Sequence, residues 1–304
     1  MIKEYLHCGS LPKSGKKGNI LLGHTTYKND NALPWVTFID GAGGVFSTWN
    51  KQLPEFKLLY NILVIELREI DTNSNSLVNL DFDTVSKSIL YVLELNNIER
   101  THIVGFSLGT IFVKYFALKY SRNVESVILS GAIAKINRRL RFLFWIQNMV
   151  KSVFSFSSQF RFFSYFLLPN KNHKETRLFI RSQSMNWDEE EFFKWAGFTK
   201  KLNPVLNYLY SEQTDVPSVF VMGEEDKLFL PEVKKMASHN PDSLLFIIQD
   251  CGHVVNMEQA LLFNRMVIGY LTGFEVASKN NRAKIKVKEG LISMERDSWK
   301  NNPV

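Results

Sequence analysis

The pentapeptide GFSLG at residues 105–109 lies between a segment typical of a buried strand and a segment typical of a helix. Residues 101–104 are largely β-branched and apolar, as expected of a short strand inside a sheet. Within residues 108–119, apolar side chains recur at three- and four-residue spacing, which is the period of a helix. The sequence therefore predicts that Ser107 lies on a sharp strand-to-helix turn.

A serine on such a turn has the surroundings of a nucleophile. A side chain at Gly105 or Gly109 would collide across the tight turn, which explains the two glycines. The turn projects the Ser107 hydroxyl outward above the N-terminus of the helix, where backbone N–H groups and the helix dipole favour negative charge. A G-x-S-x-G pattern arises by chance in roughly one chain of this length in ten, so an ordinary turn is the alternative.

The rest of the chain supplies a base and a carboxylate in the order Ser, Asp, His. His253 follows a glycine on the loop after the predicted strand 243–248. Asp226 lies just past the end of the predicted strand 218–222. A nucleophilic serine needs a base, and the base needs a carboxylate to orient it. We therefore predict a catalytic triad of Ser107, Asp226 and His253.

Other candidates for the acid and the base are weaker. Glu224 and Glu225 compete with Asp226 in the same loop, and acidic loops are commonly just solvated. Asp250 is too close to His253 in a short loop to approach its imidazole easily. The other five histidines have no comparable setting: His7, His24, His102, His173 and His239.

Backbone N–H groups that stabilise an oxyanion are expected in two places. The strand 35–39 is followed by the glycine-rich turn 40–44, and glycines let the backbone approach a substrate oxygen closely. We predict the N–H groups of Ala42 and Leu108 as the two donors. A glycine-rich turn without any role is the alternative.

These motifs resemble those of the α/β-hydrolase fold superfamily, in its compact form with one cap domain, over roughly residues 18–274. The resemblance implies an α/β fold with a mostly parallel, doubly wound, eight-stranded sheet and a helical cap insertion. The superfamily includes esterases, lipases, thioesterases, carbon–carbon hydrolases, perhydrolases and some lyases. The resemblance therefore implies the fold and the nucleophile, and says little about the substrate.

The oxyanion turn departs from the family pattern. Relatives usually have His-Gly where this chain has Asp40-Gly41. A charged Asp40 that pointed inward would oppose a developing oxyanion. If Asp40 instead bonds to neighbouring backbone N–H groups, it holds the turn. The segment after the next strand, at 68–74, also departs from the usual Gly-x-Gly-x-Ser.

A chain of 304 residues is long enough for one large core and a cap. We predict a hydrolase core formed by 1–131 and 213–275, a helical cap at 132–212 and a basic polar C-terminal tail at 276–304. The tail is expected to be part helical or disordered. The 45% hydrophobic and 22% charged residues are typical of a soluble globular protein.

The predicted cap is rich in aromatic residues and in positive charge. A strip this apolar must pack against the body, a substrate or a lipid surface. Its phenylalanines are Phe142, Phe144, Phe154, Phe156, Phe160, Phe162, Phe163 and Phe166.

Between residues 132 and 174 there are eight basic residues and no acidic one, whereas the net charge of the whole chain is +7. A solvated basic face is one interpretation, and an anionic membrane surface or an acidic carrier is the other. No nucleic-acid partner is expected, because no recognition motif accompanies the charge.

The sequence predicts a cytoplasmic protein without a cofactor or metal. No Cys/His cluster has metal-ligand spacing, and Cys8 and Cys251 form no disulfide framework. Cys251 is expected to pack in its loop. The start of the chain has no basic-then-apolar leader, and no uncharged apolar stretch is long enough to span a membrane.

These observations predict a serine hydrolase that cleaves a carboxylic ester or thioester with an apolar acyl group. Ser107 would attack the carbonyl, His253 would act as general base, and Asp226 would orient the imidazole. Two alternatives stay open. The same triad can serve carbon–carbon cleavage or a lyase-type step, or the fold can carry a weakly catalytic ligand-binding protein.

Overall fold

A computed structural model describes residues 22–41, 46–69, 81–150, 153–184, 202–212, 214–239, 243–279 and 292–294. Its strands are β1 (Leu22–Tyr27), β2 (Trp35–Ile39), β3 (Asn61–Glu69), β4 (Thr101–Phe106), β5 (Val124–Ser130), β6 (Ser218–Gly223), β7 (Ser243–Ile248) and β8 (Ile292–Met294). They form one sheet in the order β1-β3-β2-β4-β5-β6-β7-β8. Only the pairing of β1 with β3 is antiparallel among these strands. The predicted α/β fold with a mostly parallel eight-stranded sheet is confirmed.

The helices are α1 (Leu53–Phe56), α2 (Phe82–Leu95), α3 (Leu108–Lys119), α4 (Arg138–Val150), α5 (Phe156–Leu167), α6 (Lys174–Ser184), α8 (Leu202–Ser211), α9 (Leu230–His239), α10 (Val255–Glu258) and α11 (Ala260–Lys279). Short 3-10 turns lie at η1 (Phe46–Trp49), η2 (Ser121–Asn123) and η3 (Lys171–His173). Among the described helices, none is long and apolar enough to cross a membrane.

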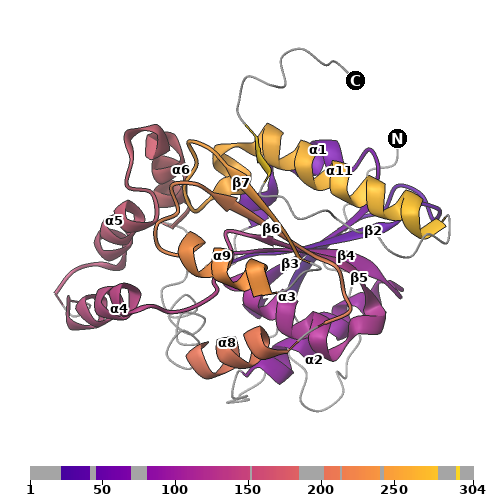
Figure 1. Ribbon diagram of the computed structural model, residues 1–304, viewed down its shortest axis with the longest axis horizontal. Helices are drawn as coiled ribbons and strands as arrows, with labels where there is room; N and C mark the ends of the chain where they lie inside the picture. Colours follow the sequence, from indigo (N-terminus) through magenta and orange to yellow (C-terminus); the bar gives the residue numbers. More distant parts are fainter. Residues whose placement is uncertain are drawn as a thin grey trace.

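Helices cover both faces of the sheet (Figure 1). On one face, α2, α3, α8 and α9 pack apolar side chains against the strands in one buried cluster. On the other face, α1, α10 and α11 pack in a second cluster around Trp49 and Phe263. The central strands β4 and β6 are buried along their whole length. Their near-continuous apolar sequences therefore follow from burial on both faces.

The tail contributes the edge strand β8, which the sequence analysis did not predict. β8 runs parallel to β7 and pairs Ile292 with Phe246 and Met294 with Ile248. It is only three residues long, which is too short for a period-two pattern to be recognised in its sequence.

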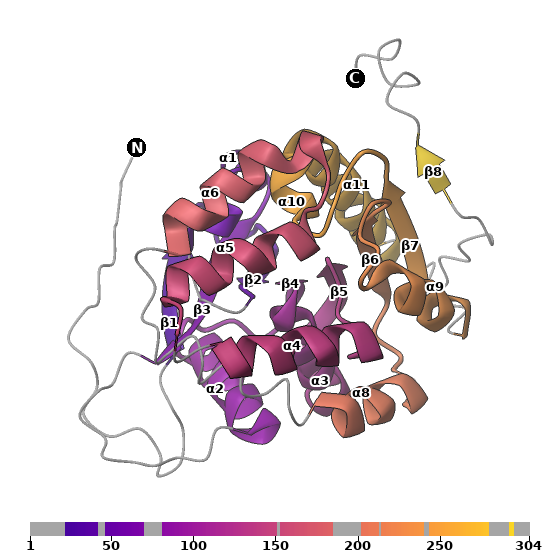
Figure 2. The same cartoon turned by 90° about the vertical axis from the view of Figure 1, so that its left-hand side faces the viewer.

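Helices α4, α5 and α6 lie between β5 and β6 in sequence and project from one end of the sheet, on the left of Figure 1. This is where the cap was predicted. Helix α8, in the same insertion, instead packs beside α3, and its Leu202, Leu206 and Leu209 join the core cluster. In the view of Figure 2, β4 and β5 are seen through the space between α4 and α5.

Candidate active site

Ser107 occupies the predicted strand-to-helix turn, directly after β4 and before α3. Its φ of 50° is rare for a residue with a side chain, so the turn is strained. The Ser107 N–H donates to the Ser130 carbonyl at 3.0 Å, which fixes the turn against β5. A Cβ on Gly109 would lie 2.4 Å from the Asp40 carbonyl oxygen. Only glycine allows the start of α3 to approach the Asp40 backbone this closely.

The structure brings Ser107, His253 and Asp226 together in one hydrogen-bonded chain. The Ser107 Oγ lies 3.0 Å from His253 Nε2, and His253 Nδ1 lies 2.8 Å from Asp226 Oδ2. A carboxylate only accepts hydrogen bonds, so Nδ1 carries the proton and Nε2 is left to accept the serine proton. His253 and Asp226 are each 2% exposed. This arrangement can activate the serine hydroxyl as a nucleophile.

The neighbouring carboxylates are arranged so that only Asp226 reaches the imidazole of His253. The second Asp226 oxygen accepts the Phe229 N–H at 3.1 Å, which orients the carboxylate. Glu225 points elsewhere: its Oε2 lies 2.6 Å from His173 Nε2 and accepts a bond from Asn172 at 2.8 Å. Asp226 therefore contacts His253, whereas Glu225 contacts His173.

The loop that carries His253 is held by Glu258, a residue that the sequence analysis did not single out. One Glu258 oxygen accepts the Gly252 N–H at 3.0 Å, and the other accepts the Val254 N–H at 3.0 Å. The two amides on either side of His253 are therefore fixed by a single carboxylate. Its spacing of five residues after His253 is the only sequence signal that could have indicated this role.

His173 links the cap to the same loop. Its side chain is fully buried, and its Nε2 lies 2.6 Å from Glu225 and 3.3 Å from Glu258. Because Nδ1 accepts the Asn170 N–H at 3.3 Å, Nε2 carries the proton that points at the two carboxylates. No local sequence pattern indicates a functional setting for His173, whereas the structure places it beside the loop of His253.

The predicted oxyanion donors remain predictions. The Leu108 N–H lies in the first turn of α3, where N–H groups have no acceptor inside the helix. Ala42 lies outside the described residues. Its neighbour Gly41 is placed beside the nucleophile, since a Cβ on Gly41 would lie 3.2 Å from the Ser107 Cβ.

Asp40 is buried beside the nucleophile turn, with 1% of its surface exposed. The Thr48 hydroxyl donates to Asp40 Oδ1, whereas the sequence analysis considered backbone N–H groups as partners. Burial raises the pKa of the Asp40 carboxyl well above its ordinary value, and the bond from Thr48 opposes this only in part. The buried carboxyl therefore keeps its proton to a higher pH than an exposed aspartate.

Cys251 lies in the buried core and burial raises its pKa, which fits the expected packing role of its side chain.

In the part of the chain that the structure describes, no group of three or more His, Cys, Asp or Glu side chains could hold a metal ion.

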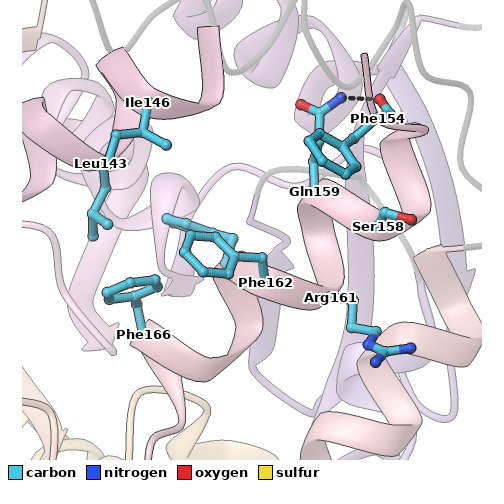
Figure 3. A pocket seen from close by; sticks show the side chains of 9 residues that line it. Leu143, Ile146, Phe154, Ser158, Gln159, Arg161, Phe162 and Phe166 are labelled. Carbon is cyan, nitrogen blue, oxygen red and sulfur yellow. Dashed lines mark hydrogen bonds between the residues drawn. The ribbon is translucent and has the colours of Figure 1, made fainter. Parts of the chain in front are cut away.

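A cavity of about 500 Å³ lies in the cap between α4 and α5. Its lining is mostly apolar: Leu143, Ile146, Phe154, Ser158, Gln159, Arg161, Phe162, Phe163 and Phe166. Figure 3 shows Leu143 and Ile146 across from Phe162 and Phe166, with the Arg161 guanidinium directed away from them. The Gln159 side-chain N–H donates to the Phe154 carbonyl at 2.8 Å, whereas the buried Gln159 Oε1 has no hydrogen-bond partner in the described part of the chain.

The comparisons with known proteins agree with the fold. A family model described as alpha/beta hydrolase fold matches residues 34–260. The chain is 23% identical over 252 residues to 2-hydroxy-6-oxononadienedioate/2-hydroxy-6-oxononatrienedioate hydrolase of Comamonas testosteroni, covering 76% of this chain and 84% of that protein. It is 21% identical over 253 residues to the putative carbamate hydrolase RutD of Acinetobacter baylyi, covering 80% and 95%. A carboxylesterase structure from Nitrososphaera gargenis aligns with a TM-score of 0.67 and 17% identity over 86% of this chain and 98% of that one.

The adjacent acids Asp226 and Glu225 form a matched pair for testing the site. We expect Asp226→Asn to slow labelling of Ser107 by a fluorophosphonate at least a hundredfold, because an amide favours the wrong tautomer of His253. Glu225→Gln also removes one carboxylate but should change the labelling rate only a few-fold. Labelling is measured by mass spectrometry, with Ser107→Ala as the unlabelled control. The reverse ranking would show that Asp226 does not orient His253.

The buried Asp40 predicts a distinctive dependence of stability on pH. The unfolded chain releases the Asp40 proton near the ordinary pKa of 3.8, whereas the folded protein retains it to higher pH. The parent protein therefore loses stability as pH rises from about 3.8 through the raised pKa. Asparagine does not titrate and accepts the same Thr48 bond. We therefore expect the melting temperature of Asp40→Asn minus that of the parent to increase as the pH is raised from about 4 to about 8.

Asp83→Asn provides a control of opposite sign. Hydrogen bonds from Lys119 and Tyr115 lower the pKa of Asp83, so its carboxylate stabilises the folded state above the ordinary pKa. Asp83→Asn should have a lower melting temperature than the parent from about pH 4 upward, and this deficit should shrink as pH falls below the ordinary pKa of 3.8. If the difference in melting temperature between Asp40→Asn and the parent did not change with pH, the raised pKa of the buried Asp40 carboxyl would be contradicted.

Proposed function

The chain belongs to the alpha/beta hydrolase fold family, and we propose that it is a serine hydrolase of carboxylic esters or thioesters with an apolar acyl group. The observation that carries this proposal is the hydrogen-bonded chain from Ser107 through His253 to Asp226. The cap cavity, lined largely by aromatic and aliphatic side chains, supports an apolar substrate.

The reaction follows from the positions of these groups. Ser107 Oγ attacks the acyl carbonyl while His253 Nε2 takes its proton, and buried Asp226 stabilises the resulting imidazolium. Negative charge then develops on the carbonyl oxygen near the N-terminus of α3, where the Leu108 N–H is the proposed donor. His253 returns its proton to the leaving group. It next activates a water, which attacks the acyl-enzyme and releases the acid.

Carbon–carbon cleavage is the second candidate, because a relative in Comamonas testosteroni is named as a dienedioate hydrolase. A dioate carries two carboxylates. Arg161 is the only charged side chain among the residues that line the described cavity, and Figure 3 shows it directed away from the aromatic rings. The apolar interior therefore favours an uncharged acyl chain over a doubly charged substrate.

Esters of increasing acyl length test the proposed substrate. We expect kcat/KM for p-nitrophenyl esters to rise from acetate to octanoate by up to about fourfold per methylene, because each methylene leaves water for the apolar cavity. Phe166→Ala should flatten this profile by removing a ring from the cavity lining. Leu178→Ala removes an exposed apolar side chain of α6 outside the lining and is the matched control.

The same panel separates the alternatives. Initial rates for the p-nitrophenyl esters and matching acyl-CoA thioesters are compared with those for a 2-hydroxy-6-oxo-dienoate. Turnover of the dienoate together with inert esters would favour carbon–carbon hydrolysis. Absence of turnover with every substrate would favour a ligand-binding protein.

A further inference from the structure

Helix α4 exposes a face made of arginine and large apolar side chains. Arg138, Arg141, Phe142, Trp145 and Met149 are exposed, and their spacing of three or four residues places them on one side of the helix. Phe142, Trp145 and Met149 are each between 57% and 59% exposed. The Phe142 and Trp145 rings stack with centroids 5.8 Å apart. A surface helix ordinarily buries its apolar side chains and exposes polar ones.

Helix α5 repeats this composition. Arg161, Phe162 and Tyr165 are exposed at the same kind of spacing. The guanidinium groups of Arg177 and Arg181 lie 4.9 Å and 4.7 Å from the centre of the Tyr165 ring, which brings further positive charge to this helix. Figures 1 and 2 both place α4 and α5 at the outer side of the molecule.

We give the name cap face to the following exposed side chains of these two helices: Arg138, Arg141, Phe142, Trp145, Met149, Arg161, Phe162 and Tyr165. Exposed apolar side chains are concentrated in this region. Of the fourteen large hydrophobic residues that are exposed in the described chain, eight lie between residues 142 and 166. Exposed apolar side chains that are concentrated in this way commonly mark a site of interaction with a protein or a membrane.

The charge of this region indicates the chemistry of the partner. Between residues 132 and 174 the sequence has eight basic residues and no acidic one. Six of the basic residues are exposed: Lys135, Arg138, Arg141, Arg161, Lys171 and Lys174. A partner that matches both properties must be negatively charged and must also accept aromatic side chains. An anionic lipid surface does both, because arginines bind its phosphates while tryptophan and phenylalanine enter the headgroup region.

We propose that the cap face docks on an anionic lipid surface and that the cavity between α4 and α5 opens toward the lipid. Arg161 and Phe162 of the cap face are exposed and also line the cavity, so the cavity reaches the surface at the cap face. An acyl chain could then pass from the lipid layer into the apolar cavity without crossing water. Docking itself does not depend on the proposed function, whereas this route for the substrate rests on it.

Vesicle co-sedimentation of the full chain tests docking. We expect binding to phosphatidylcholine vesicles that contain about 30% phosphatidylglycerol and much weaker binding to phosphatidylcholine alone. Binding should fall as salt is raised from about 0.05 M to 0.5 M, because salt screens the attraction between arginines and phosphates. Ser107→Ala should bind equally well, which separates docking from catalysis.

Matched variants locate the surface. Arg138→Gln/Arg141→Gln should weaken binding roughly 25-fold, since each basic side chain near an anionic surface contributes about fivefold. Trp145→Ser should weaken it at least about tenfold through lost apolar burial. Two control variants change exposed side chains of the body instead. Lys87→Gln/Arg122→Gln removes two cations, and Leu58→Ser removes one apolar side chain. Both controls should bind vesicles like the parent. Thermal unfolding of each variant checks that it folds.

Three results would overturn the docking proposal. One is equal binding to both kinds of vesicle, and another is a loss in the body controls as large as that in the cap-face variants. The third is absence of binding to anionic vesicles, which would point to an acidic protein as the partner of the cap face. Failure of the ester panel with vesicle binding intact would instead refute the proposed function and leave docking standing.

Discussion

The loops at the carboxyl end of the sheet pack against one another so closely that several positions have no room for a side chain. A Cβ on Gly223 would lie 2.1 Å from the Gly252 carbonyl oxygen, and one on Gly131 would lie 2.6 Å from the His253 carbonyl oxygen. These glycines stand at the ends of β6 and β5, and the loops beside them carry Asp226 and His253. The parallel strands end at a common edge, so close packing of their loops brings the three triad side chains within hydrogen-bond distance.

The position of His253 also depends on the cap. Glu258 fixes the amides on both sides of His253, and His173 from η3 contacts Glu258 and Glu225. A Cβ on Gly252 would lie 3.0 Å from the His173 ring, so the cap segment is packed directly against the loop. Displacement of this segment would therefore remove the His173 N–H from Glu225, which is partly exposed, and from the nearly buried Glu258, which would keep its two backbone N–H donors. The seating of the cap and the position of the base are physically linked.

Local sequence patterns were sufficient to predict some features and not others. The strand-to-helix turn of Ser107 and the loop of His253 are encoded by neighbouring residues, so both were predictable. The distinction between Asp226 and Glu225 depends on His173, 52 residues away from Glu225, and no local pattern contains it. The edge strand β8 gains its structure only by pairing with β7. Asp40 was recognised as unusual, but its burial and its bond from Thr48 required the fold.

The central claim is that Ser107 forms a covalent acyl intermediate, and trapping that intermediate tests it most directly. The protein is mixed with p-nitrophenyl octanoate, quenched in acid within milliseconds, digested and analysed by mass spectrometry. An octanoyl group on the peptide that contains Ser107, formed as fast as p-nitrophenol is released, is the predicted result. Turnover without acylation of Ser107, or acylation of Cys251 in its place, would contradict the account.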